Sequence, residues 1–158
     1  MSAPPAGPPQ AEQKKIRIMV VDDSNVIRHC ARTFLVAAGY EVLMAENGFD
    51  ALTQVADRRP DLILLDAIMP RLDGYRTCSL IKSNDKYRNI PIIMLSAKDS
   101  LFDRVRGRLA GANDYVTKPF CREVLLRAVA TRLQAVAAHR GPFARNAGQL
   151  SHIDVALA

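Results

Sequence analysis

Residues 16–24 have the sequence IRIMVVDDS, and this stretch decides the fold. Residues 16–21 are rich in apolar and β-branched side chains, and Asp22, Asp23 and Ser24 end the run abruptly. This pattern is typical of a buried strand followed by a polar loop. Ser24 can cap the next segment, whose apolar residues recur at helical spacing until Gly39 supplies a left-handed stop. The stretch therefore predicts a strand, an acidic loop and a helix, in that order.

The same alternation of apolar runs and helical patterns continues along the chain. The apolar runs predict further strands at residues 41–45, 62–65, 92–95 and 114–116. The helical patterns predict further helices at residues 49–57, 75–83, 101–110 and 122–137. Strands that are apolar throughout need cover on both faces, and a parallel sheet with right-handed helical crossovers provides it. The sequence thus predicts an α/β fold, a doubly wound sheet of five parallel strands with five helices.

Length and composition indicate one such domain with two tails. With 158 residues and 49% hydrophobic content, the chain can enclose one sizeable core. Residues 1–13 hold four prolines among small and polar residues, which predicts a disordered tail, and residues 14–137 form the predicted domain. Residues 138–158 lose the helical periodicity and predict a flexible C-terminal tail.

Charge, cysteine content and hydropathy argue against several classes of function. The formal charge of +6 comes from basic residues that are spread out rather than gathered, so we expect no nucleic-acid partner. Cys30, Cys78 and Cys121 are far apart and odd in number, which indicates buried or inert thiols rather than disulfides or a zinc site. No apolar run approaches the roughly 20 residues that span a bilayer, so we expect a cytoplasmic protein without membrane insertion. We also expect a monomer or weak dimer.

Polar residues follow four of the predicted strands, at the edge where ligands collect in an open parallel sheet. Asp22 and Asp23 follow the first strand, Asp66 the third, Ser96 the fourth and Lys118 the fifth. Three carboxylates at one edge repel one another, so a cation is expected among them, and oxygen donors favour Mg²⁺ or Mn²⁺. Lys118 can pair with Asp66 before reaction and, like Ser96, contact a phosphoryl group afterwards, which makes Asp66 the candidate nucleophile. Each residue alone is more simply a turn former or helix start, but their coincidence favours a shared site.

Four motifs at these strand ends resemble the receiver domain of bacterial two-component response regulators, of the CheY-like chemotaxis type. They are VVDDS at residues 20–24, LLDAIMPRLDGY at 64–75, IIMLSAKD at 92–99 and DYVTKPF at 114–120. The resemblance covers residues 16–133 and implies a flavodoxin-like fold with strand order 2-1-3-4-5. It also implies a signalling protein rather than an enzyme, one that catalyses only its own phosphorylation and dephosphorylation.

The resemblance implies specific roles at the acidic cluster. Asp66 is then the phosphoacceptor, and Asp23, Asp66 and the backbone carbonyl of Ile68 are Mg²⁺ ligands, while Asp22 acts through water. Ile68 occupies a position beside the phosphoryl group that is often polar in fast-cycling members of the family. Because an apolar side chain cannot position an attacking water, we expect a long-lived acyl phosphate. Lys98 leaves the opposite outcome open if it binds water.

The resemblance also implies a switch and an unusual peptide bond. Ser96 and Lys118 contact the phosphoryl group, and the Lys118–Pro119 peptide bond is expected to be cis. Ser96 and Tyr115 form the switch: Ser96 moves toward the phosphoryl group, and Tyr115 turns inward behind it. This movement alters a protein-binding face made by the last two helices and the strand between them.

A second similarity lies on the third and fourth helices. Residues 77–82 (TCSLIK), 101–103 and 107–108 are similar to those of single-domain regulators of twitching motility. This implies a chemosensory-type, CheA-like histidine kinase and a downstream pilus-system or second-messenger protein as partners. Two alternatives stay open: a pseudo-receiver that only binds proteins, and the receiver part of a transcriptional regulator. A dehalogenase-like phosphatase is disfavoured, because its second aspartate is replaced by Ile68.

Overall fold

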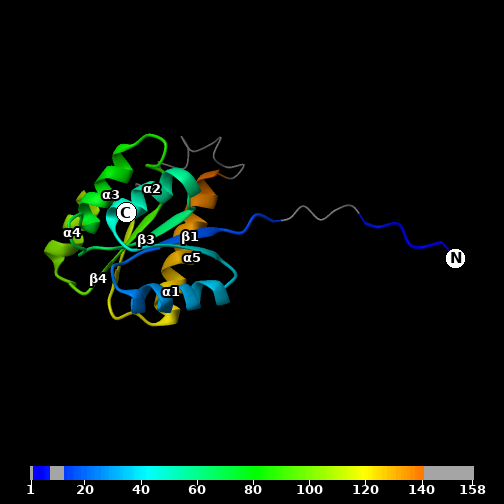
Figure 1. Ribbon diagram of the computed structural model, residues 1–158, viewed down its shortest axis with the longest axis horizontal. Coiled ribbons are helices and arrows are strands. Elements are labelled where there is room, and N and C mark those ends of the chain that lie inside the picture. Colours follow the sequence, from blue (N-terminus) through cyan, green and yellow to red (C-terminus); the bar gives the residue numbers. More distant parts are fainter. Residues whose placement is uncertain (1, 8–12, 141–158) are drawn as a thin grey trace, which may run out of the picture.

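Five short parallel strands form a sheet between two layers of helices in the computed structural model, which describes residues 2–7 and 13–140 (Figure 1). The strands are β1 (Arg17–Val21), β2 (Glu41–Ala45), β3 (Leu62–Asp66), β4 (Ile92–Ser96) and β5 (Asp114–Thr117). The helices are α1 (Asn25–Ala37), α2 (Gly48–Arg58), α3 (Gly74–Ser83), α4 (Leu101–Leu109) and α5 (Arg122–Arg140). Each predicted strand and helix is present, in the predicted sequence order.

The strand order is β2-β1-β3-β4-β5, with all pairs parallel. The chain therefore moves outward from β1 to one edge of the sheet and then returns past β1 to build the other edge. The order reverses between β1 and β3, and this switch point opens a crevice beyond the carboxyl ends of these two strands. The predicted doubly wound α/β fold is confirmed.

Alternating side chains of the strands belong to two separate hydrophobic cores, one on each face of the sheet. Residues such as Met19, Leu65 and Met94 pack against α2 and α3, whereas Ile18, Leu64 and Leu95 pack against α1 and α5. Figure 1 shows these two helical layers on opposite sides of the sheet. All residues of β3 and β4 are buried, which is why both sequences are apolar up to their last residues, Asp66 and Ser96.

The observed element boundaries differ from the predicted ones by a residue or two, with one larger difference. Helix α5 runs to Arg140 and so includes residues 138–140, which the sequence pattern assigned to the C-terminal tail. No glycine or proline interrupts the chain there until Gly141 and Pro142. Gly39 has a φ of +95°, in agreement with its predicted role in ending α1.

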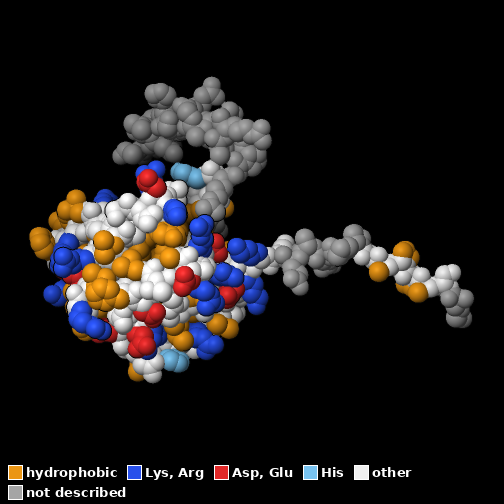
Figure 2. Space-filling view, turned by 45° about the horizontal axis from the view of Figure 1, so that its top comes forward, with side chains coloured by type: hydrophobic (Ala, Val, Ile, Leu, Met, Phe, Trp, Pro, Cys, Tyr) orange, Lys and Arg blue, Asp and Glu red, His pale blue; other side chains and the backbone are white. Residues whose placement is uncertain are grey.

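The rest of the predicted tails is described only in part. Residues 2–7 and 13–15 are exposed and have no regular secondary structure, while residues 141–158 lie outside the described residues. Among the described residues, no helix is both long and apolar enough to cross a membrane. On the face seen in Figure 2, lysine and arginine side chains are interspersed with acidic and apolar ones.

The three thiols are not all buried. Cys78 on α3 is buried and Cys30 on α1 is half-buried, but Cys121 is exposed. The sequence predicted buried or inert thiols, and burial does not hold for Cys121, because this residue lies in the short loop between β5 and α5 rather than on a packed face of a helix.

Candidate functional site

The carboxyl ends of the central strands bring the predicted acidic residues together. Asp22 and Asp23 directly follow β1, and Asp66 is the last residue of β3, which neighbours β1 in the sheet. Carboxylate oxygens of the three aspartates all lie within 4.8 Å of one another. Asp22 and Asp66 are buried, whereas Asp23 is exposed and opens the cluster to solvent.

Lys118 supplies positive charge to this cluster. Its Nζ lies 3.1 Å from Oδ1 of Asp66 and 2.5 Å from Oδ2 of Asp22. Its backbone N–H donates a hydrogen bond of 2.8 Å to the carbonyl of Ser96, so the loop after β5 is fixed to the end of β4. The Lys118–Pro119 peptide bond is cis. The lysine thus sits between two carboxylates and serves as their counterion.

Two structural details hold Asp22 in place. Its Oδ1 accepts a hydrogen bond of 2.9 Å from the backbone N–H of Ser24, and its backbone carbonyl accepts one of 2.6 Å from Arg28. Ser24 also caps α1, because its side chain accepts from the backbone N–H of Ile27. The start of α1 and the acidic loop are therefore one hydrogen-bonded unit.

The pKa of Asp66 is raised to about 6. Burial is the largest cause, the negative charge of Asp22 adds to it, and Lys118 opposes both. Burial alone would lower the pKa of Lys118, but hydrogen bonds and charges from Asp22 and Asp66 raise it above its ordinary value. Asp66 is therefore mostly ionised at neutral pH, and Lys118 is charged beside it.

The donor set of the cluster fits a hard divalent cation. The three aspartates offer only oxygen atoms, which Mg²⁺ and Mn²⁺ prefer, and two of these side chains are withdrawn from bulk water. Ile68 follows in the loop after β3, and the resemblance of the sequence motifs implied that its carbonyl belongs to the same site. Its backbone N–H donates to Oδ1 of Asp66 over 3.4 Å, so this loop curls around the acidic cluster.

Gly74 lets helix α3 begin directly against the end of β3. A Cβ atom at this position would lie 2.0 Å from the backbone oxygen of Asp66, which is too close for any side chain to fit. The backbone N–H of Gly74 donates to the carbonyl of Ala67, and Asp73 caps the helix. Although the sequence motif included Gly74, only the structure reveals that this residue positions the Asp66 backbone.

Ser96 and Tyr115 lie on the neighbouring strands β4 and β5, at one side of the cluster. Ser96 ends β4 and is buried, and its Oγ accepts a hydrogen bond of 3.1 Å from the backbone N–H of Lys98. The hydroxyl of half-buried Tyr115 donates to the carbonyl of Lys98 over 2.5 Å. Tyr115 and Ser96 therefore hold the same residue of the β4–α4 loop, one through its carbonyl and the other through its N–H.

Sequence reasoning missed one contact at the site. It paired Lys118 with Asp66, but the shorter of the two ion pairs is with Asp22. The residues are 96 positions apart in the chain, and both follow strands, so the pattern offers no way to rank the two carboxylates as partners. The preference depends on the side-chain geometry at the switch point.

Comparisons with known proteins agree with this geometry. The family model of the response regulator receiver domain matches residues 18–130. The protein PilG of Pseudomonas aeruginosa is 51% identical over 114 residues, which are 72% of this chain and 84% of PilG. The response regulator MprA of a Mycobacterium species, strain KMS, is 39% identical over 142 residues, 90% of this chain and 60% of MprA. The matched part of the chain thus spans most of PilG but less than two thirds of MprA.

A solved structure supports the same assignment. The chemotaxis protein CheY4 of Vibrio cholerae superimposes with a TM-score of 0.72 at 32% identity, covering 75% of this chain and 98% of CheY4. These similarities confirm the resemblance drawn from the four strand-end motifs. Receiver domains are signalling modules that interact with a histidine kinase and with downstream partners. The chain belongs to the response regulator receiver domain family.

Proposed function

We propose that Asp66 accepts a phosphoryl group from a phosphohistidine of a chemosensory-type, CheA-like kinase. The observation that carries this proposal is the pair of contacts from Lys118 to Asp66 and Asp22, at a cluster of three carboxylates. An oxygen of Asp66 attacks phosphorus, the phosphorus–nitrogen bond breaks, and the imidazole leaves with its electron pair and takes a proton from water. No general base is needed, because Asp66 is already ionised at neutral pH.

The remaining residues of the site bind and orient the transferred group. Asp23, Asp66 and the Ile68 carbonyl would hold Mg²⁺, with Asp22 acting through water, and the bound cation would neutralise charge on the phosphoryl oxygens. Lys118 turns from Asp66 toward a phosphoryl oxygen once the carboxylate has reacted. The Ser96 hydroxyl donates to a second oxygen and leaves its bond with the Lys98 N–H.

The output of this reaction is a changed protein-binding face. When Ser96 moves, Tyr115 turns inward and its hydroxyl leaves the Lys98 carbonyl, which frees the β4–α4 loop. Helix α4 already exposes several large apolar side chains, and exposed apolar surface of this kind marks a binding site for another protein. These residues are Leu101, Phe102 and Val105. By similarity to PilG, we infer that the partner belongs to a type IV pilus system or a second-messenger pathway.

Phosphorylation from acetyl phosphate in Mg²⁺ tests the proposal. The wild-type chain should incorporate base-labile phosphate, and Asp66→Asn should incorporate none. Asp57→Asn, an exposed carboxylate on α2, should label like the wild type. Labelling that survives in Asp66→Asn would show that another residue is the acceptor, and an unlabelled wild type would favour a pseudo-receiver.

Phosphotransfer from purified histidine kinases identifies the partner. A chemosensory-type kinase should phosphorylate the chain faster than other kinases of the same host. Preferential transfer from a kinase of another type would refute the proposed pathway and leave the role of Asp66 intact.

A further inference from the structure

A second surface lies away from the phosphorylation site, where α2, α3 and α4 meet. A shallow groove of about 670 Å³ runs between α3 and α4 and ends near the first turn of α2. Its walls carry three arginines: Arg71 in the loop before α3, Arg76 on α3 and Arg106 on α4. Among the described residues that line it, none bears a carboxylate. The described residues that line the groove therefore carry a net positive charge, although Asp73 lies close to Arg106.

Apolar side chains lie beside these arginines. Leu80 on α3 is 49% exposed, Leu109 on α4 is 83% exposed, and Phe49 at the start of α2 is also exposed. A polar residue at any of these positions would cost little stability, because none of the three contributes to the two hydrophobic cores. A groove that combines exposed aliphatic side chains with cations on both walls is complementary to a segment with an apolar stripe flanked by acids.

Arg106 is held in position for such a partner. Its guanidinium lies over the ring of Tyr75, 4.2 Å from the ring centroid, and 3.8 Å from a carboxylate oxygen of Asp73. Stacking on the ring fixes the side chain along the groove and reduces the conformational entropy lost on binding. Tyr75 itself is buried and belongs to the core. One wall of the groove is thus preorganised.

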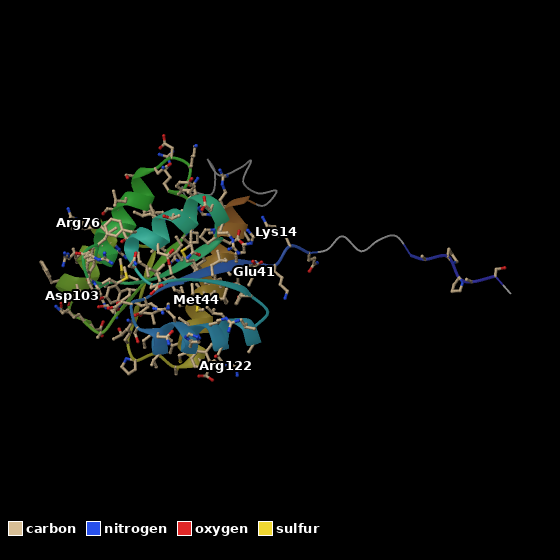
Figure 3. The ribbon with its side chains drawn as sticks, viewed as in Figure 1. Lys14, Glu41, Met44, Arg76, Asp103 and Arg122 are labelled. Atoms are coloured by element: carbon tan, nitrogen blue, oxygen red, sulfur yellow. The ribbon has the colours of Figure 1, made fainter. Side chains whose placement is uncertain are left out.

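Arg76 stands on the opposite wall and is exposed. Figure 3 shows Arg76 on α3 and Asp103 on α4 at the same side of the molecule. Arg76 and Leu80 are one turn apart on α3, so a cation and an apolar side chain lie next to each other on the same face of this helix. This arrangement suits a helix that lies between α3 and α4.

We propose that the groove between α3 and α4 binds an acidic amphipathic helix of a partner protein. The apolar side of that helix contacts Leu80 and Leu109, and its carboxylates pair with Arg76 and Arg106. None of the described residues that line the groove belongs to the acidic cluster, so the proposal does not rest on Asp66 being the phosphoacceptor. Nucleic acid is disfavoured, because Phe49 is the only exposed aromatic side chain among the described residues that line the groove, so bases lack a stacking platform.

Selection from a phage-displayed library of random helical peptides against the full chain tests the proposal. The recovered peptides should combine Leu, Ile or Phe at helical spacing with flanking Asp and Glu. The dissociation constant of the strongest binder, measured by fluorescence anisotropy, should rise by about tenfold or more in Arg76→Glu and in Leu80→Asp. Both positions are exposed on α3, and circular dichroism and thermal unfolding should show that both variants fold.

Matched controls come from α1, on the opposite side of the sheet. Val36 is 50% exposed, close to Leu80, and Arg32 is exposed like Arg76. Val36→Asp and Arg32→Glu should leave the dissociation constant within about twofold of the wild type. The proposal is overturned if no peptide is recovered, if the recovered peptides lack acidic residues, or if the controls weaken binding as much as the groove variants. Single-stranded DNA of 20 nucleotides that binds the wild type but not Arg76→Glu would also overturn it.

Discussion

The negative charge of Asp66 destabilises the folded protein. Its pKa is raised from 3.8 to about 6, so between these values the folded state holds a proton that the unfolded state has lost. Stability contributed by this group therefore falls as pH rises through that window, and the full cost is present above about pH 6. The cost reaches about 3 kcal/mol at most.

Replacing this carboxylate should stabilise the metal-free protein. In EDTA at pH 8, Asp66→Asn should raise the free energy of unfolding, and the gain should shrink toward zero as pH falls to about 4. Urea unfolding at a series of pH values measures the difference. The control Asp57→Asn should show no comparable pH dependence. A stabilisation that grows toward low pH would contradict the cause assigned to the pKa shift.

Ile68 is 51% exposed at the mouth of the site, although it is a large apolar residue. Because its side chain cannot orient a water molecule toward phosphorus, we expect the acyl phosphate to persist. Ile68→Asn should shorten the lifetime of the acyl phosphate several-fold, and Ile68→Leu should leave it unchanged. Decay of incorporated radiolabel in Mg²⁺ measures both. Equal lifetimes in the two variants would mean that another residue, such as Lys98, controls hydrolysis.

At the scale of elements, the junction of β3 and α3 requires a glycine at position 74. A Cβ atom at position 74 would meet backbone atoms of Asp66 and Ala67, which cannot rotate away. Gly74→Ala should therefore destabilise the protein by about 1–3 kcal/mol or more and displace Asp66. Chemical denaturation measures the first effect, and acetyl phosphate labelling should fall with it. Gly7→Ala, with no neighbouring atom within 4 Å, should change neither.

The whole molecule should respond to magnesium through the acidic cluster. A cation that binds only the folded state at a hundredfold excess over its dissociation constant stabilises by about 2.7 kcal/mol. We expect Mg²⁺ to raise the melting temperature of the wild type, EDTA to reverse the rise, and Asp23→Asn to weaken it. Calorimetric scans with and without Mg²⁺ measure this. An equal rise in Asp23→Asn would place the cation elsewhere.

The sequence alone predicted the architecture of the whole molecule because each element carries its own signal. The strands β3 and β4 are apolar up to their last residues, and a glycine ends α1, so the alternation of strand and helix is explicit. The clustering of Asp22, Asp66 and Lys118 followed from a general property of parallel sheets. Their coincidence at strand ends, rather than any one residue, made the site visible.

Features formed by distant residues could not be predicted in this way. The ion pair of Lys118 with Asp22 depends on side-chain geometry across β1, β3 and β5. The groove draws Phe49 from α2, Arg76 from α3 and Arg106 from α4, and none of these residues belongs to a recognisable motif. The end of α5 was misplaced because its last residues are compatible with either a helix or a tail.

Helix α4 is anchored in a way that sets it apart from its neighbours. Gly107 is its single buried residue, and a Cβ atom there would lie 3.4 Å from the ring of Tyr115 and 3.9 Å from that of Tyr75. At Gly107 the helix backbone thus packs directly on two aromatic rings, and the helix exposes little additional apolar area if it moves away. Its amide hydrogens should exchange with deuterium through local opening, long before those of α1, which buries Ala31 and Leu35. Phosphorylation at the carboxyl ends of the strands then needs only to release one helix with a small buried area, while the rest of the molecule keeps its structure.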